Sequence, residues 1–145
     1  MAGKVLTART IFVEAMSAKI ERVKGTKFKA NVGGFEIVTG REGADSPPSG
    51  MAAGQVLFAA IGLCTGTRLV EQMERRGWKV GAVSVNVRPK VSKDMNRATE
   101  IAMEVEMEAD LTEEQRQEML KEAGRCFVSN TIKNTPDFRV ELKLT

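Results

Sequence analysis

Alternating apolar and polar residues predict β-strands in the first part of the chain. Residues 27–38, KFKANVGGFEIV, alternate on both sides of Gly33 and Gly34, which is typical of two strands joined by a tight Gly-Gly turn. An earlier alternating piece at 18–23 predicts a third strand, whereas residues 4–16 fit a helix or a strand equally well. The pattern therefore predicts an antiparallel β-region before residue 40.

The second half of the chain carries three more alternating stretches. Residues 82–91 and 99–110 predict two strands, and the turn-forming residues between them predict a hairpin. The last stretch, 137–145, predicts a closing strand whose inward side chains would be Phe138, Val140, Leu142 and Leu144.

A long stretch without proline predicts one helix over residues 50–76, with Ser49 as its N-cap and Gly77 beyond its end. Its first half, MAAGQVLFAAIGLC, is apolar nearly all round, and such a helix must be buried on more than one face. One small sheet cannot cover it, so we expect a homodimer in which the helix packs against its twin. Glycines at four-residue spacing would let another backbone approach closely: Gly50, Gly54, Gly62 and Gly66.

Two shorter helices are predicted after the second hairpin. Residues 111–126 begin with a capping box of Thr112 and Gln115 and end near Gly124, and a short helix is predicted at 127–134. Because strands joined by hairpins pair antiparallel, the order of elements predicts an α+β fold with antiparallel sheets packed on a long central helix. At 145 residues the chain, 1–145, is expected to be a single domain, with 1–17 as an N-terminal extension.

Composition narrows the function classes. The net charge of +3 is slight and Lys and Arg are mixed with Asp and Glu, so nucleic-acid binding is not expected. The N-terminus has no apolar signal-peptide core and no stretch reaches the uncharged length of a membrane span, so we expect a cytoplasmic protein without a membrane partner.

The absence of histidine and tyrosine limits the chemistry further. Without histidine the chain has no Ser-His-Asp or Cys-His nucleophile pair and lacks the commonest zinc ligand. The two cysteines stand 62 positions apart and form no CxxC motif, so neither a zinc ribbon nor a thioredoxin-type motif is expected. These absences leave the cysteines as the candidate reactive groups.

Cys64 lies in the apolar run FAAIGLCTGTRLVEQM, and Cys126 lies where one predicted helix ends and the next begins. Either could be a small buried core residue. If Cys64 reacts, apolar burial raises its pKa, and an arginine or lysine must stabilise its thiolate; the candidates are Arg22, Arg41 and Arg68, the last of which fits a surface charge equally well. Cys126, at a helix start, suits a thiolate or a resolving thiol.

The stretch SPPSGMAAGQVLFAAIGLCTG runs from a proline-containing loop into the apolar helix, and GRCFVSNTI follows a capped helix. Together they resemble the OsmC/Ohr family, the osmotically inducible protein C and organic hydroperoxide resistance proteins. The resemblance covers residue 18 to the end and is nearer the general OsmC-like branch. It implies an intertwined homodimer in which Cys64 attacks a hydroperoxide and becomes a sulfenic acid, and Cys126 resolves it to a disulfide. It further implies that no cofactor is needed and that an external dithiol or lipoyl-type reductant reopens the disulfide.

The resemblance also implies an arginine that stabilises the thiolate and a glutamate that holds the arginine. Arg22 is the nearest match to this arginine, and Arg41 is the alternative. The glutamate's place, ten residues before the first cysteine, is Gly54, and its neighbour is the neutral Gln55. Gln55 can hydrogen-bond a guanidinium but supplies no charge.

We therefore expect a thiol-dependent peroxidase of peroxiredoxin type, acting on organic or small hydroperoxides in an oxidative stress response. A second hypothesis is a non-catalytic OsmC-like dimer that binds an apolar ligand at its interface. A third is a purely structural partner protein. Loss of both thiols under peroxide distinguishes the first hypothesis from the other two.

Overall fold

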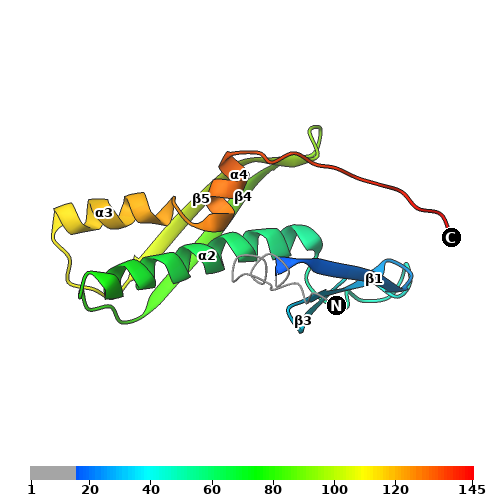
Figure 1. The fold of residues 1–145 in the computed structure, drawn as a ribbon, viewed down its shortest axis with the longest axis horizontal. Coiled ribbons are helices and arrows are strands. Elements are labelled where there is room, and N and C mark those ends of the chain that lie inside the picture. Colours follow the sequence, from blue (N-terminus) through cyan, green and yellow to red (C-terminus); the bar gives the residue numbers. More distant parts are fainter. Residues whose placement is uncertain (1–15) are drawn as a thin grey trace, which may run out of the picture. The chain divides into compact units, whose positions relative to one another are not determined.

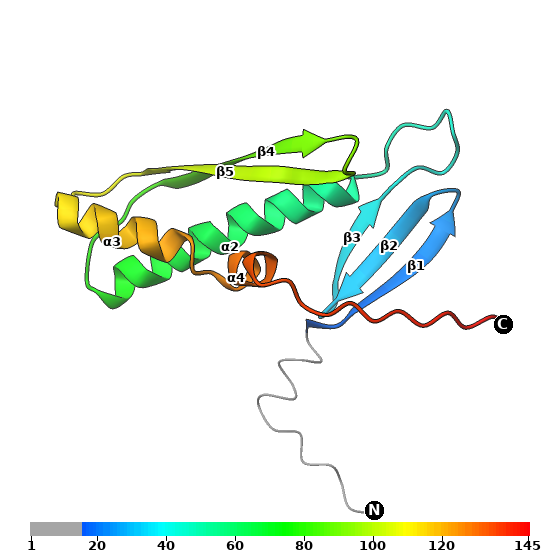
Figure 2. The same ribbon diagram turned by 90° about the horizontal axis from the view of Figure 1, so that it is seen from above.

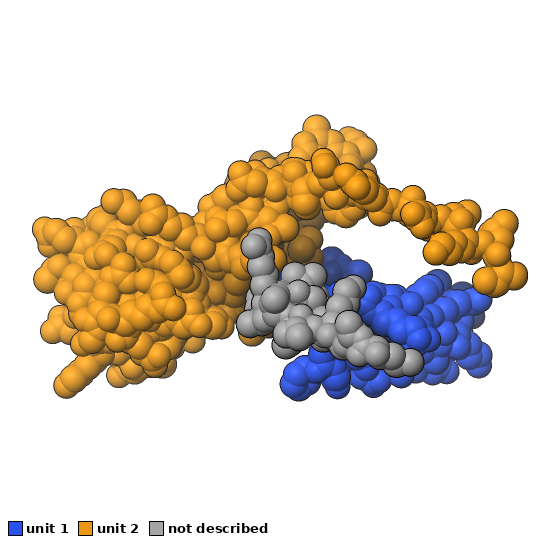
Figure 3. Space-filling view, in the orientation of Figure 1, with its two compact units in different colours: residues 1–56 blue, residues 57–145 orange. Residues whose placement is uncertain are grey.

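The computed structural model describes residues 16–145, so most of the segment predicted as helix or strand at 4–16 lies outside the described residues. The chain divides into two compact units, residues 1–56 and 57–145, coloured separately in Figure 3. The expectation that the whole chain is one domain stays a prediction.

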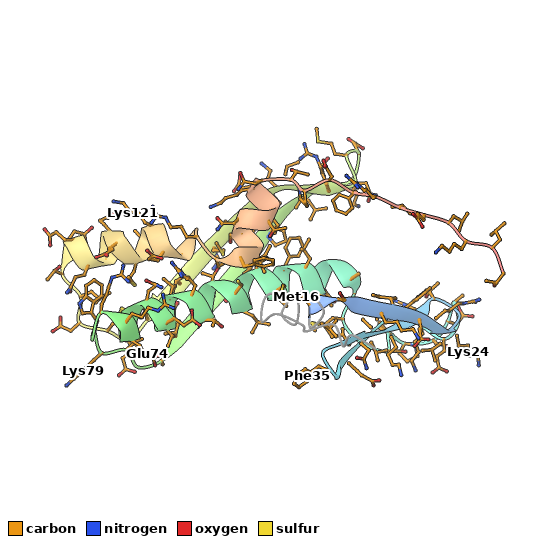
Figure 4. All side chains as sticks on the ribbon, in the orientation of Figure 1. Met16, Lys24, Phe35, Glu74, Lys79 and Lys121 are labelled. Carbon is orange, nitrogen blue, oxygen red and sulfur yellow. The ribbon has the colours of Figure 1, made fainter. Side chains whose placement is uncertain are left out.

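The first unit contains an antiparallel sheet of three strands in the order β1-β2-β3 (Figure 2). The strands are β1 (Ala18–Lys24), β2 (Lys27–Val32) and β3 (Phe35–Thr39). Gly33 and Gly34 join β2 to β3 with φ values of 56° and 84°, a backbone region that glycine enters without steric cost. The three predicted strands and the Gly-Gly turn are confirmed. Phe35, labelled in Figure 4, is 81% exposed.

The long helix is α2 (Ala53–Arg75), and it begins later than the sequence predicted. Ser49 is not its N-cap, because Ser49 lies in the preceding loop and donates its backbone N–H to a loop carbonyl at 2.8 Å. The Ala52 carbonyl accepts the first helical hydrogen bond, and the Gln55 side chain accepts the Ala52 N–H at 2.8 Å. Gln55 thus supplies the glutamine half of a capping box, so a cap residue with a side-chain acceptor is not needed there.

The second unit contains a two-stranded antiparallel sheet formed by β4 (Val83–Ser92) and β5 (Arg97–Met107). The predicted hairpin is confirmed, and Asn96 turns it with a φ of 49°, a conformation that asparagine tolerates. The strand predicted to reach residue 110 ends at 107, since the chain then turns toward the next helix.

Two helices follow the hairpin, α3 (Glu113–Ala123) and α4 (Phe127–Lys133), as predicted. The capping box of α3 is present in full: Thr112 Oγ1 accepts the Gln115 N–H at 3.2 Å, and Gln115 Oε1 accepts the Thr112 N–H at 2.9 Å. Gly124 is the C-cap of α3.

A small core joins α2, α3 and the end of the hairpin within the second unit, and Figure 1 shows α3 alongside α2 there. Leu69, Met73 and Met119 are at most 5% exposed. Partly buried side chains surround them: Trp78, Val80, Val105, Met107, Ala109, Leu111 and Ala123. This core fixes α2 against α3, and therefore determines where the connection from α3 to α4 lies.

Within the described part of the chain, residues 16–145, one face of α2 is buried. Its buried residues are Ile61, Thr65, Leu69, Gln72 and Met73. Leu57 and Leu63 are 47% and 72% exposed, so residues 16–145 of one chain do not bury α2 on several faces as expected. Of the described helices, α2 is also the one that is long and apolar enough to cross a membrane, which the sequence had not led us to expect. A core helix of a soluble protein meets the same two criteria.

The glycines of this region differ in what surrounds them. A Cβ on Gly50 would stand 2.1 Å from the Val38 carbonyl oxygen, so close backbone approach is confirmed there, before α2 begins. A Cβ on Gly62 would meet a β4 valine methyl at 3.1 Å, whereas Gly54 has open space around it. The expectation of close backbone approach thus holds for Gly50, whereas Gly62 meets a side chain, and at Gly54 the approach of a second chain stays a prediction.

The closing strand predicted at 137–145 is wrong for this structure, in which residues 135–145 form no strand. Four alternating side chains are 84–89% exposed: Phe138, Val140, Leu142 and Leu144. A strand needs a partner for its backbone N–H and C=O groups, and no described strand pairs with this segment. The alternation is therefore present without a sheet to pack on.

Candidate functional site

Cys64 lies on α2 and is half-buried. It is a free thiol, and the backbone N–H groups of Phe127 and Val128 donate hydrogen bonds to its sulfur. These two groups belong to the first turn of α4, where helical N–H groups have no intrahelical acceptor. The packing of α4 against α2 therefore brings unpaired donors to the Cys64 sulfur.

Cys126 is the N-cap of α4 and is only 3% exposed. Its Sγ accepts the Ser129 N–H at 3.4 Å and donates to Ser129 Oγ at 3.2 Å. The Thr65 hydroxyl, on α2, lies 3.9 Å from the same sulfur. The cysteine thus takes the place that serine or threonine fills at most helix starts.

The two thiols, 62 positions apart in the sequence, interact with each other in the fold. The Cys64 thiol is hydrogen-bonded to the Cys126 sulfur, so Cys126 raises the pKa of Cys64 and Cys64 lowers the pKa of Cys126. Thr65, which follows Cys64 on α2 and contacts Cys126, links the two positions. The structure therefore brings together the two cysteines that the sequence singled out.

Burial raises the pKa of the Cys64 thiol above its ordinary value, as expected from its apolar surroundings. The N–H groups of Val128 and Phe127 act in the opposite direction, because they favour the charged sulfur. Cys126 adds to the rise, since two neighbouring sulfurs do not readily carry charge together.

The pKa of the Cys126 thiol is shifted downward instead. Burial acts to raise it, but hydrogen bonds from Ser129, Cys64 and Thr65 together outweigh burial and hold this pKa below its ordinary value. Of the pair, Cys126 is therefore the thiol that ionises first. The resemblance gave the first thiolate to Cys64, and this chain by itself favours the opposite order.

A nearly buried carboxylate, Glu122, joins the end of α3 to α2 through an arginine. Glu122, 7% exposed, accepts from Arg68 Nε at 3.0 Å and from Arg68 Nη2 at 2.6 Å. Arg76 and Arg125 lie 3.7 and 3.8 Å from its other oxygen. Arg68, one turn beyond Cys64, is therefore paired with a carboxylate and joins α2 to the end of α3.

The remaining candidates belong to the first unit. Arg22 Nε donates to the Gly25 carbonyl at 2.8 Å, within its own hairpin, and Arg41 Nη1 donates to the Ser46 carbonyl at 3.4 Å. Gln55 caps α2 with its side-chain oxygen, which has a second lone pair available. Whether these residues act on the thiols stays a prediction.

Sequence reasoning missed Thr65, Ser129 and Glu122. Ser129 stands three positions after Cys126, at the N3 position of α4, where a side chain faces back to the cap. Glu122 follows Met119 by three positions and so shares the apolar side of α3, which was the available signal that this carboxylate is buried. Thr65 gave no such signal.

An open apolar groove of about 840 Å³ runs along α2 and β4 within the second unit. Its lining includes Phe58, Leu63, Val70, Val83, Val85 and Val87, and neither cysteine lines it. Among residues 16–145 no group of three or more His, Cys, Asp or Glu side chains is arranged to hold a metal ion.

The family model described as OsmC-like protein matches residues 43–141 of the chain. No curated protein matches the sequence. Among solved structures, an OsmC-like protein from Mycoplasma pneumoniae is similar, with a TM-score of 0.67, 17% identity and coverage of 82% of this chain and 89% of that one. A hypothetical protein from Aquifex aeolicus VF5 is similar as well, with a TM-score of 0.69, 18% identity and coverage of 84% and 89%. At these identities the likeness shows a shared fold.

Proposed function

Because the chain belongs to the OsmC-like protein family, we propose that it is a thiol-dependent peroxidase that reduces organic or small hydroperoxides with Cys64 and Cys126. The observation that carries this proposal is the interaction of the two thiols across 62 positions of sequence. A sulfenic acid is converted to a disulfide only where a second thiol is within reach. The chemistry of the family is thiol-based and free of cofactors.

In the first step the Cys64 thiolate attacks the outer oxygen of the hydroperoxide. The O–O bond breaks, Cys64 becomes a sulfenic acid, and the alkoxide leaves and takes a proton. Cys64 is the half-buried member of the pair and Cys126 is almost fully buried, so a substrate from solvent meets Cys64. The N–H groups of Phe127 and Val128 stabilise its charged form, and Arg22 or Arg41, held by Gln55, is proposed to add the positive charge.

In the second step the Cys126 thiolate attacks the sulfur of the Cys64 sulfenic acid. The S–O bond breaks, the hydroxide leaves as water after taking a proton, and a Cys64–Cys126 disulfide forms. The lowered pKa of Cys126 supports this role, because a resolving thiol must be a thiolate in order to attack. An external dithiol, including one of lipoyl type, then reopens the disulfide.

We further propose that the working form is a cytoplasmic homodimer. The support is apolar surface that residues 16–145 of one chain leave uncovered: Leu57 and Leu63 on α2, and the alternating residues at 137–145. Large exposed apolar patches mark sites of association. A second copy would bury them, as the near-complete apolar character of the first half of α2 requires.

A second candidate function is binding of an apolar ligand, and the groove along α2 and β4 favours it. A groove lined by valines, Phe58 and Leu63 suits a hydrophobic molecule of moderate size. In that case peroxide would leave both thiols intact, and a fluorescent apolar probe would bind the dimer in a saturable manner.

The deciding experiment is a titration of the reduced protein with cumene hydroperoxide and with hydrogen peroxide. We expect loss of both thiols and a Cys64–Cys126 disulfide, located by peptide mapping. Cys64→Ser should abolish peroxide consumption, whereas Cys126→Ser should consume one equivalent and stop at a Cys64 sulfenic acid. Persistence of both thiols at excess peroxide would contradict the peroxidase proposal.

A further inference from the structure

The two sulfurs that the proposed function joins have unequal surroundings. Cys126 is 3% exposed, whereas Cys64 is half-buried. An external reductant must bring its own sulfur into line with the disulfide bond, and this requires access to the sulfur that it attacks. Access therefore favours attack at Cys64.

The second difference is that buried hydroxyl groups surround Cys126. Ser129 is 6% exposed and Thr65 is fully buried. The Ser129 hydroxyl lies 3.2 Å from the Cys126 sulfur and the Thr65 hydroxyl lies 3.9 Å from it. A hydroxyl hydrogen can rotate, so the Ser129 and Thr65 hydroxyls can both donate to the Cys126 sulfur when it is a thiolate.

The Thr65 hydroxyl also donates to the Met103 sulfur at 3.5 Å. A thioether is a weak acceptor and a thiolate is a strong one. When Cys126 carries a negative charge, rotation of the Thr65 hydroxyl toward it is therefore favourable. The backbone N–H of Ser129, 3.4 Å from the same sulfur, is already directed at it.

Resting on the proposed function, we propose that the dithiol reductant attacks the sulfur of Cys64, and that Thr65 and Ser129 are catalytic residues of this step because they stabilise Cys126 as the departing thiolate. A leaving thiol departs faster when its anion is more stable. Both access and hydrogen bonding thus select the same direction of exchange.

The step balances as follows. A thiolate of the reductant forms an S–S bond with Cys64, the Cys64–Cys126 bond breaks, and its electron pair stays on Cys126. The second thiolate of the reductant then attacks its own sulfur in the mixed disulfide and releases Cys64, which takes a proton. The dithiol leaves as a cyclic disulfide. The protein has gained two electrons, with Cys64 left as a thiol and Cys126 as a thiolate that takes a proton according to the pH.

The test begins from a disulfide made with diamide rather than with peroxide. The oxidised protein is mixed with glutathione, a monothiol that cannot complete the second step, quenched in acid and alkylated, and the peptides are mapped. We expect glutathione on Cys64 and the alkyl group on Cys126. Glutathione mainly on Cys126, or equally on both cysteines, overturns the direction of attack, and failure of diamide to form the disulfide overturns the proposal altogether.

Variants test the hydroxyl groups separately. Thr65→Val and Ser129→Ala should each slow the exchange about 3-fold, the change expected when the leaving thiol's pKa rises by about one unit. Thr65→Ser keeps the hydroxyl and should exchange at the wild-type rate. Thr67→Val makes the same replacement at an exposed position of α2 and should change nothing. Unchanged rates in Thr65→Val and Ser129→Ala overturn the role of the hydroxyl groups.

Because diamide replaces peroxide, these results separate this inference from the proposed function. A protein that does not consume peroxide but exchanges through Cys64 supports the inference and contradicts the peroxidase proposal. A protein that consumes peroxide but carries glutathione on Cys126 supports the peroxidase proposal and contradicts the inference.

Discussion

Glu122 of α3 accepts two hydrogen bonds from Arg68 of α2, at 3.0 and 2.6 Å, and its carboxylate side chain is almost fully buried. The pair fixes the end of α3 against the helix that carries Cys64. Since α3 leads through Gly124 and Arg125 to Cys126, the pair also determines where the second thiol lies.

Replacing Glu122 should therefore affect both stability and disulfide formation. We expect Glu122→Gln to lower the free energy of unfolding by about 2 kcal/mol, since Arg68 loses its charged partner while remaining partly solvated. Urea denaturation measures this change. The matched control is Glu118→Gln, whose partner Arg76 lies 2.7 Å away and whose own side chain is 46% exposed, and there we expect less than about 1 kcal/mol.

The two thiols should ionise in a defined order. The pKa of Cys126 is held down by its hydrogen bonds and that of Cys64 is raised by burial, so on raising the pH Cys126 should become a thiolate before Cys64. Brief iodoacetamide labelling over a pH series, followed by peptide mapping, gives a midpoint for each cysteine. The midpoint of Cys126 should lie below that of Cys64, and the reverse order would contradict this assignment.

Replacing Cys126 should shift the pH midpoint at which Cys64 is labelled. In Cys126→Ser the neighbouring thiolate is gone, and the pKa of Cys64 should fall relative to the wild type, because Cys126 is one of the causes that raise it. An unchanged Cys64 midpoint would show that the two thiols do not interact in solution.

The choice between Arg22 and Arg41 is open to a direct comparison. If Arg22 stabilises the Cys64 thiolate, Arg22→Ala should slow the oxidation of Cys64 by cumene hydroperoxide about 10-fold, which corresponds to about one pKa unit. Arg41→Ala is the matched comparison, because it removes the same group from the same unit, and slower oxidation in that variant alone would assign the role to Arg41. Equal rates in the wild type and both variants would exclude both arginines.

The uncovered face of α2 predicts the oligomeric state. Leu63 is 72% exposed, and we expect the wild type to be a dimer and Leu63→Asp to be a monomer in analytical ultracentrifugation. Glu74, labelled in Figure 4, is an exposed residue further along the same helix, and Glu74→Lys should leave the dimer intact. A monomeric wild type would contradict the proposed assembly.

Local patterns in the sequence were sufficient to predict most of the helices, strands and turns. The Gly33-Gly34 turn, the capping box of Thr112 and Gln115 and the short helix after Cys126 all depend on residues within a few positions of each other. Such short-range preferences act on a few consecutive residues, and these can be identified from one sequence. The start of α2 was misplaced because Gln55, three positions into the helix from Ala52, supplies the cap instead of Ser49.

The alternation at 137–145 shows the limit of such patterns. Alternating residues indicate that a segment can form a strand with one apolar face. A strand forms only where another segment provides hydrogen-bond partners for its backbone N–H and C=O groups. No described strand does so here.

The sequence by itself determined the candidate chemistry: two cysteines, no histidine, and a helix too apolar for one chain to cover. Only the tertiary structure decided that Cys64 and Cys126 interact and that the lowered pKa belongs to Cys126. The physical reason is that a thiol's ionisation depends on burial and on donors brought from other helices. Thr65 comes to Cys126 from α2, and the donors to Cys64 come from α4, so neither set of contacts is visible in the order of residues along the chain.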